Sequence, residues 1–187
     1  MESVGFKEWA LVCEALGRGE QTIILRKGGI AEGRDGFSFK HREFFLFPTF
    51  FHEQVGKVRG GPAELPRAMD GEIEVRFFAK LEAAVTITLA ETAGALDPFH
   101  ILQAEVVRER FEYDEAPGIH VAFLRTFRLA TAWKFPDQPQ FGGCRSWLRL
   151  PEPPAEMRLD AVLNDAEHAA RLTEFRAIVA REAAAAA

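Results

Sequence analysis

The sequence predicts an α+β fold: a mixed, largely antiparallel sheet or small barrel, with an N-terminal helix and a C-terminal helix packed on it. Short apolar and β-branched runs fill the middle of the chain, and apolar residues recur at helical spacing at both ends. The 187 residues are 48% hydrophobic and 27% charged, which suits a well-cored domain and excludes a disordered regulator or a rod. We expect a single α+β domain over residues 1–150, followed by a proline-rich spacer and a helix over residues 151–187.

The first part of the chain is expected to form one helix and two strands. Near the N-terminus, apolar side chains at helical spacing predict an amphipathic helix that stops at Gly17. These side chains are Phe6, Trp9, Ala10, Cys13 and Leu16. Residues 21–26 form a β-branched run ended by a diglycine, and residues 44–47 form a second apolar run ended by Pro48. Each run has the length of a buried strand.

The middle of the chain carries the most strand signal. Residues 72–88 alternate in part and are long enough for two strands or one bent strand. Residues 101–111 place apolar side chains near one helical face and predict a short helix. Residues 120–129 predict a further strand, and residues 146–150 a last short one.

A stiff Glu-Pro-Pro spacer separates this body from a final helix, because proline fixes φ and removes a donor. Asn164 can cap that helix, and Asp165 and Glu167 suit its positive N-terminal end. An apolar stripe predicts that the helix docks on the body. The stripe consists of Leu172, Phe175, Ile178 and Val179.

The charge balance and the cysteine content limit which binding partners and which cellular compartment we expect. Lys and Arg total 23 against 28 Asp and Glu, so the chain as a whole has no charge excess for gripping nucleic acid, although a local basic face is compatible with these numbers. Residues 26–67 hold eight cations and five acids, whereas the tail is acidic. Two distant cysteines fit a reducing cytoplasm, and no apolar run has the length of a membrane span. We therefore expect a cytoplasmic protein with no membrane partner.

The turn after the first predicted strand is the most distinctive local feature. Arg26 and Lys27 precede Gly28 and Gly29, so positive side chains and backbone amides meet at one place. Phosphates and carboxylates are bound by such combinations. The alternative is a plain turn with a solvated cation pair, since glycine is common in turns.

Thr49 and His52 follow the second predicted strand. If the two strands pair side by side in parallel, Thr49 and His52 project into the same cleft as Arg26 and Lys27, and His52 becomes a candidate acid/base. Thr49 also fits as the N-cap of a helix over residues 50–59. Arg125 and Arg128 point to opposite faces of a regular strand, so at most one of them enters the cleft, and we take Arg125 as its candidate.

Cys144 lies between a diglycine and Arg145, where a cation could activate a thiolate. No histidine lies near it in sequence, so packing beside Trp147 is favoured, and we expect Cys144 to be packed or half-buried and inert. The five histidines include no helical metal-site spacing, and the carboxylates lack the pattern of a magnesium nuclease. We expect no metal and no cofactor.

Several of these segments together resemble the domain-of-unknown-function family 1802. The most specific are Arg-Lys-Gly-Gly-Ile at 26–30 and Pro-Thr-x-x-His at 48–52. The other segments are residues 7–9, 14–16, 24–25, 45–47, 123–129 and 143–147. The resemblance covers residues 6–150. Some members of that family are joined to a restriction-endonuclease-type domain, so the resemblance implies a role in restriction-modification or another DNA-linked system and a nuclease partner.

Three functions remain open from the sequence. The first is a non-catalytic domain that is associated with DNA or RNA or senses a nucleotide or phosphate. Its cleft would be lined by Arg26, Lys27, Thr49, His52 and Arg125. The second is a small enzyme acting on an anionic metabolite, with His52 as acid/base and the cation pair as clamp. The third is an interaction module that docks through its tail helix.

Overall fold

The computed structural model describes residues 2–27, 37–60, 70–113 and 116–185, and these confirm the α+β fold. The strands are β1 (Val4–Trp9), β2 (Ile23–Lys27), β3 (Glu43–Thr49), β4 (Glu72–Ile87), β5 (Ile119–Pro136), β6 (Trp147–Arg149) and β7 (Leu159–Ala161). The α-helices are α1 (Ala10–Gly17), α2 (Ala90–Ala95), α3 (Ala104–Phe111) and α4 (Asp165–Ala185). Three 3₁₀ helices connect them: η1 (His52–Lys57), η2 (Asp97–Phe99) and η3 (Pro139–Phe141).

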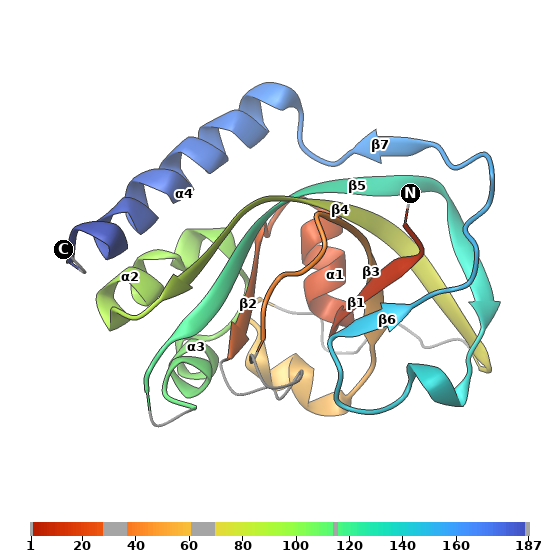
Figure 1. The fold of residues 1–187 in the computed structure, drawn as a ribbon, viewed down its shortest axis with the longest axis horizontal. Helices are drawn as coiled ribbons and strands as arrows, with labels where there is room; N and C mark the ends of the chain where they lie inside the picture. Colours follow the sequence, from red (N-terminus) through yellow and green to blue (C-terminus); the bar gives the residue numbers. More distant parts are fainter. Residues whose placement is uncertain (1, 28–36, 61–69, 114–115, 186–187) are drawn as a thin grey trace.

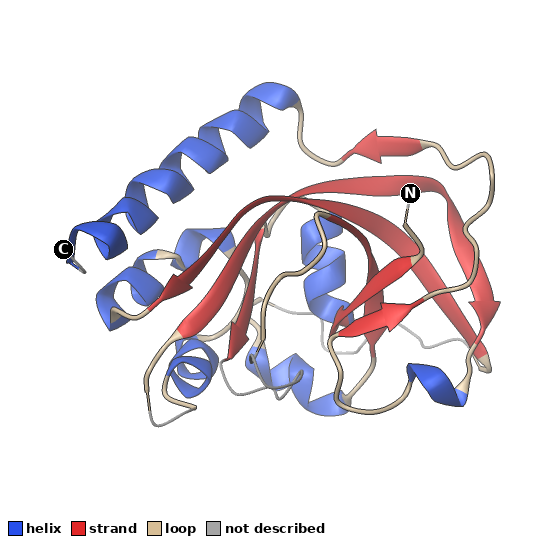
Figure 2. Cartoon of the chain, in the orientation of Figure 1, coloured by secondary structure: helices blue, strands red, loops and turns tan. Residues whose placement is uncertain are grey.

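One mostly antiparallel sheet organises the described residues (Figures 1 and 2). Its strand order is β2-β5-β4-β3-β1-β6, and β7 pairs with β5. The exception to the antiparallel pattern is β1, which runs parallel to β3. In Figure 1, α1 lies beneath the arch of the sheet, α2 and α3 lie at its left, and α4 runs above α2 at the upper left.

The long ribbon of β4 and β5 gives the sheet its curvature. The two strands pair along nearly their whole length, and the register shifts between Val75 and Phe77 and between Leu81 and Ala83. Such irregularities bend and twist a strand pair. Of the two alternatives that the sequence leaves open for residues 72–88, two strands or one bent strand, the structure shows one bent strand, β4.

The N-terminal segment differs from the sequence prediction. Residues 4–9 form strand β1, and the helix begins only at Ala10. Phe6 and Glu8 are buried on one face of the strand. The prediction of a helix from Phe6 was wrong because pairing with β3 and β6, both distant in sequence, outweighs the local spacing.

The expected neighbours β2 and β3 are also not side by side. β2 pairs with β5, with Arg26 opposite His120, and both β5 and β4 separate β2 from β3 in the sheet. The parallel pairing that was to bring their ends together is therefore wrong. The curvature of the sheet nevertheless carries the end of β2 back toward β1, as the contacts of Arg26 show below.

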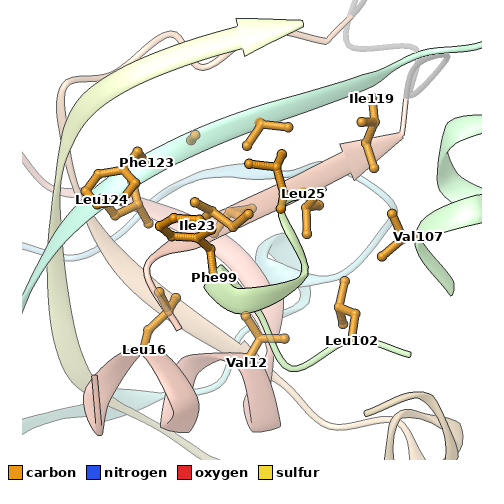
Figure 3. Close-up of a cluster of buried hydrophobic side chains, with 14 of the residues drawn as sticks. Val12, Leu16, Ile23, Leu25, Phe99, Leu102, Val107, Ile119, Phe123 and Leu124 are labelled. Carbon is orange, nitrogen blue, oxygen red and sulfur yellow. The ribbon is translucent and has the colours of Figure 1, made fainter. Parts of the chain in front are cut away.

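Two clusters of buried side chains fill the molecule. The larger one lies between the sheet and the helices and contains Leu16, Ile23 and Phe123 (Figure 3). The smaller one lies around Phe45, Phe78 and Trp133. The core is thus largely aromatic and aliphatic, as the composition indicates.

The C-terminal helix packs on the larger cluster, as its stripe predicts. Phe175 is fully buried, with its ring centroid 6.1 Å from that of Phe99 and 5.0 Å from that of Phe123. Asn164 caps the helix: its Oδ1 accepts from the amide of Glu167, whose carboxylate accepts from the Asn164 amide. Leu172, Ile178 and Val179 of the stripe are partly buried against the same cluster. Within the described residues, no helix is long and apolar enough to span a membrane.

Candidate functional site

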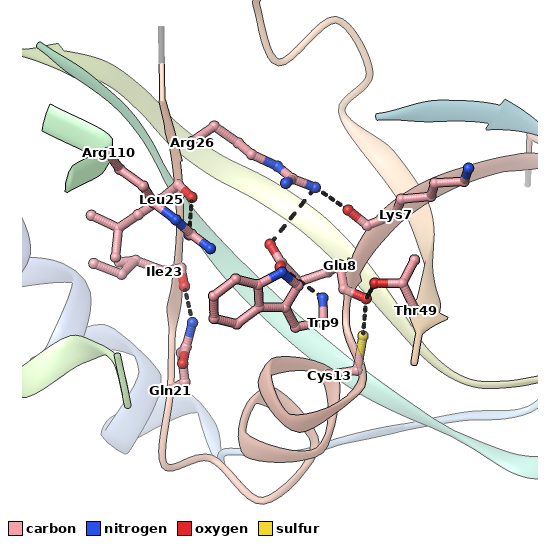
Figure 4. Close-up of polar contacts among 10 residues, drawn as sticks. All are labelled: Lys7, Glu8, Trp9, Cys13, Gln21, Ile23, Leu25, Arg26, Thr49 and Arg110. Atoms are coloured by element: carbon pink, nitrogen blue, oxygen red, sulfur yellow. Dashed lines mark hydrogen bonds and ion pairs between the residues drawn. The ribbon is translucent and has the colours of Figure 1, made fainter. Parts of the chain in front are cut away.

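Arg26 joins the end of β2 to β1 (Figure 4). Its Nη2 donates to the carbonyl oxygen of Lys7 and lies 3.9 Å from a carboxylate oxygen of Glu8. The guanidinium also lies over the ring of Phe6, 4.7 Å from its centroid. These contacts hold the positively charged guanidinium of Arg26, near the end of β2, against β1.

Glu8 places a buried carboxylate in the same cluster. Its side chain is 1% exposed, and Oε1 accepts from the amide of Trp9 at 2.8 Å. A buried carboxylate needs nearby cations and donors, because desolvation penalises the charge. The inward position of Glu8 follows from the alternation of β1, which places it on the face of Phe6.

Arg110 of α3 brings a second guanidinium to this cluster. It donates to the carbonyl of Leu25 at 2.7 Å and lies 4.6 Å from the centroid of the Trp9 ring. Burial lowers the pKa of Arg110 to about 10, and the charge of Glu8 opposes that shift. Arg110 therefore remains charged at neutral pH, so two cations surround one carboxylate. We call Glu8, Arg26 and Arg110 the buried charge cluster.

Thr49 meets the same stretch of β1 from the other side. Its hydroxyl donates to the carbonyl of Glu8 at 3.0 Å. The alternative role of Thr49 as an N-cap was wrong: η1 begins at His52, and no side chain caps it. Gln54, fully buried, holds this corner by accepting from the amide of Leu11 and donating to the carbonyl of Thr49.

Lys27 lies beside an exposed aromatic ring. Its Nζ is 3.6 Å from the centroid of Tyr113, whose residue is 55% exposed. Phe50, next to Thr49, is 38% exposed. A cation and an exposed ring thus occur together at the end of β2, and a second exposed ring follows the end of β3. Gly28 and Gly29, the rest of the predicted anion site, lie outside the described residues.

An open groove runs beside Thr49 on the opposite face of β1 from Glu8. It has a volume of about 590 Å³, and its walls include Lys7, Phe50 and Phe141. Lys7 extends over it and donates from Nζ to the carbonyls of Gly142 and Gly143 at 3.1 and 2.8 Å. Partial burial, and after it the charge of Arg145, lower the pKa of Lys7.

The five predicted site residues are only partly brought together. Arg26 and Thr49 each donate a hydrogen bond to a backbone carbonyl of β1, Arg26 to that of Lys7 and Thr49 to that of Glu8. His52 is exposed at the start of η1, and no contact joins it to Arg26 among the described residues. Arg125 forms an ion pair with Asp165 at the start of α4, so its described contacts lie with the docked helix.

Cys144 is exposed, so the expectation of a packed or half-buried thiol was wrong. The diglycine before it turns the chain outward, with Gly143 at a φ of +76°. Trp147 packs inward instead, its ring 4.7 Å from that of Phe6. Within the described part of the chain, no group of three or more His, Cys, Asp or Glu residues could hold a metal ion.

The sequence reading missed Glu8, Arg110 and Gln54. Glu8 was assigned to a helix, where it would have faced solvent. Arg110 was expected only to offset the charges of neighbouring glutamates. A usable signal was the position of Glu8 two residues after Phe6, since strand alternation puts both on one face. Nothing local indicates that Arg110 meets a residue about 100 positions away.

A family model described as a domain of unknown function, DUF1802, matches residues 5–174. The match confirms the resemblance stated above and extends it through the proline-rich spacer into α4. A search of curated proteins finds no match to the chain.

Among solved structures, the chain is similar in fold to the ASCH protein from Zymomonas mobilis, in its unsubstituted form and as two point mutants. The unsubstituted protein is 14% identical, with a TM-score of 0.43 and coverage of 91% of this chain and 93% of the other. A tyrosine-to-phenylalanine mutant is 16% identical, with a TM-score of 0.48 and coverage of 92% and 97%. A serine-to-alanine mutant is 15% identical, with a TM-score of 0.45 and coverage of 91% and 93%.

Proposed function

We propose that this chain, which belongs to the DUF1802 family, is a non-catalytic domain that binds single-stranded nucleic acid where β1, β2 and β3 end. Arg26 and Lys27 would contact phosphate, and the exposed rings of Phe50 and Tyr113 would stack with bases. Basic side chains interleaved with exposed aromatic rings are typical of such surfaces.

The observation that carries the proposal is the incomplete hydrogen bonding of Arg26. Nη2 is bonded to the Lys7 carbonyl, whereas the buried Nε has no acceptor among the described residues. Nε itself is enclosed, so an incoming acceptor recovers the cost of this unpaired donor only when the guanidinium, whose side chain is 14% exposed, turns toward the surface. A phosphate oxygen is a suitable acceptor, because guanidinium and phosphate match in geometry and charge.

The surrounding charges support the same conclusion. The buried charge cluster holds two cations and one carboxylate, and Lys27 adds a cation at its rim. This local excess is positive although the whole chain has a net charge of −5. The proposed surface thus concentrates positive charge in one place, and association would depend strongly on salt.

The alternative of a small enzyme acting on an anionic metabolite required His52 to act beside Arg26. No contact joins these two residues in the described part of the chain. The docking module uses the stripe on α4, of which Phe175 is buried in the core and Leu172, Ile178 and Val179 are partly buried, so this alternative stays a prediction. A restriction-type nuclease partner, which the family resemblance implies, stays a prediction.

A binding assay with a labelled single-stranded oligonucleotide tests the proposal. We expect Arg26→Ala together with Lys27→Ala to weaken binding at low salt by roughly 10-fold or more, since each loses a charged contact. The matched control is Arg176→Ala with Arg181→Ala, which removes the same charge from the exposed side of α4. Equal weakening by both double variants would contradict a local site.

Arg26 also contacts the buried Glu8, so replacing Arg26 can disturb the fold as well as the binding surface. A second variant that leaves Arg26 in place is therefore tested. Tyr113→Ala removes an exposed ring, and we expect it to weaken binding by roughly 5-fold or more if a base stacks there. Leu89→Ala, at a residue 37% exposed beside α2, is its control. Unchanged binding by Tyr113→Ala would remove base stacking at this residue from the account.

A further inference from the structure

A small cavity lies where the start of β2, the middle of β5 and the start of α4 meet, at the opposite end of β2 from Lys27. Its volume is about 10 Å³, close to the space that a single water molecule requires. Its walls include Leu16, Thr22, Leu124, Thr126, Leu163 and His168. The cavity is thus assembled from segments that are distant in sequence.

The cavity lies at an interruption along one edge of β5. β4 occupies the other edge along nearly the whole strand, so β2 and β7 both pair with this one. The amide of Leu124 donates to the carbonyl of Thr22 at 2.9 Å, and the amide of Val162 donates to the carbonyl of Thr126 at 3.0 Å. These two bonds flank the place where pairing with β2 has ended and pairing with β7 begins. Polar groups at such a place need partners other than a neighbouring strand.

Three buried polar atoms of the wall residues have no hydrogen-bond partner in the described part of the chain. They are Thr22 Oγ1, Thr126 Oγ1 and His168 Nε2. Their residues are 3%, 7% and 5% exposed, respectively. The distance of 3.8 Å from His168 Nε2 to a carboxylate oxygen of Glu82 is too long for a hydrogen bond. Buried polar atoms without partners cost free energy, and a shared partner removes that cost.

The two hydroxyl groups belong to side chains on the same face of the sheet. The bond between the Leu124 amide and the Thr22 carbonyl continues the register of β2 with β5, so these two residues lie opposite each other. Thr126 is two residues further along β5 and therefore has the orientation of Leu124, because side chains alternate along a strand. Thr22 and Thr126 are thus diagonal neighbours, too far apart for two short side chains to bond directly. One water molecule can bridge such a pair.

The charges around the cavity favour a neutral occupant. Arg125, at its edge, forms an ion pair with Asp165. Burial, and after it the charge of Arg125, lower the pKa of His168, against the opposing charges of Glu82 and Asp165. The imidazole is therefore largely uncharged at neutral pH. Two hydroxyls and a neutral imidazole offer both donors and acceptors, which suits a water molecule better than an ion.

We propose that this cavity binds one internal water molecule, which joins β2, β5 and α4 through Thr22, Thr126 and His168. Three protein partners are the usual number for a buried water. The water completes the interrupted edge of β5 and holds the first turn of α4 to the sheet. It is thus a bound component of the fold at the junction between the body and the C-terminal helix.

Relaxation dispersion of ¹⁷O in solvent water counts the long-lived internal waters of the native full chain. Thr22→Val with Thr126→Val keeps the shape of both side chains and removes both hydroxyls, so we expect this variant to lose one such water. The matched control is Thr131→Val with Thr173→Val, at exposed threonines of β5 and α4, which should leave the count unchanged. An unchanged count in the folded Thr22→Val, Thr126→Val protein would overturn the proposal.

Denaturant unfolding of the two single variants gives a second outcome that does not depend on counting waters. A hydroxyl bonded to the water stabilises the fold, so Thr22→Val and Thr126→Val should each lower the equilibrium constant for folding by roughly 2- to 10-fold. A hydroxyl left unpaired in a dry cavity destabilises the fold, so its replacement by valine would leave that constant unchanged or raise it. The latter result for either variant would contradict the proposed site.

Discussion

At the scale of single residues, successive side chains of β1 point to opposite faces of the strand, so groups of different chemistry lie on its two sides. Phe6 and Glu8 face the core, where the carboxylate meets Arg26 at 3.9 Å, and Lys7 faces the open groove. One strand therefore contributes both to the buried charge cluster and to the surface beside it. This arrangement links the position of Arg26 directly to the order of residues 6–8.

The two cysteines are predicted to differ sharply in reactivity. Cys144 is exposed, whereas Cys13 is buried with a pKa raised well above its ordinary value, first by burial and then by Glu8. Titration of the native protein with a disulfide thiol reagent should modify one thiol rapidly and the second only after unfolding. Cys144→Ser should remove the rapid phase. A rapid phase that persists in Cys144→Ser would contradict these placements.

At the scale of elements, α4 is bound at both ends and in the middle. Asp165 pairs with Arg125 at its start, Phe175 enters the core, and Glu182 accepts from Thr88 and from the amide of Leu89 near its end. The helix therefore covers part of the larger core cluster. Its contacts connect β5, the core and the start of α2.

Replacement of Phe175 measures how far the body depends on this helix. Phe175→Ala should lower the free energy of unfolding by about 3–5 kcal/mol, because it leaves a cavity between Phe99 and Phe123. Denaturant titration measures the change. Phe50→Ala, at a 38% exposed residue, should change stability by only about 0.5 kcal/mol. A similar small effect for Phe175→Ala would mean that the helix is an appendage to an independent body.

Glu182 makes the attachment of α4 sensitive to acid. Burial acts to raise the pKa of Glu182, but hydrogen bonds from the side chain and amide of Thr88 and from neighbouring donors lower it overall. A folded-state pKa below the ordinary 4.5 means that the carboxylate stabilises the fold above that pH and loses this effect as pH falls through the folded value.

Thermal unfolding of Glu182→Gln as a function of pH checks this contribution. The variant should melt below the wild-type protein at neutral pH, and the difference should shrink as the pH falls below 4.5. Glu174→Gln, on the exposed side of the same helix, is the control. A difference that stays constant down to acid pH would show that the charge of Glu182 does not contribute.

At the scale of the whole molecule, local signals predicted local structure, and long-range pairing decided the rest. The cap at Asn164, the stripe through Phe175 and the strand character of residues 72–88 followed from short-range patterns. The β1 strand and the separation of β2 from β3 depend on strand partners far along the chain, which no local pattern specifies. Arg26 and Thr49 are both bonded to β1, a strand that the sequence did not indicate.

The central claim is that Arg26 and Lys27 form part of a surface that neutralises several phosphates. Its most direct test is the dependence of oligonucleotide affinity on salt. For roughly three to five neutralised phosphates, log affinity should fall against log salt with a slope of about −2 to −4, and the Arg26→Ala, Lys27→Ala double variant should reduce that slope by about two. The Arg176→Ala, Arg181→Ala control should leave the slope unchanged. A wild-type slope near about −1, or no binding to single- or double-stranded oligonucleotides at low salt, would contradict the account.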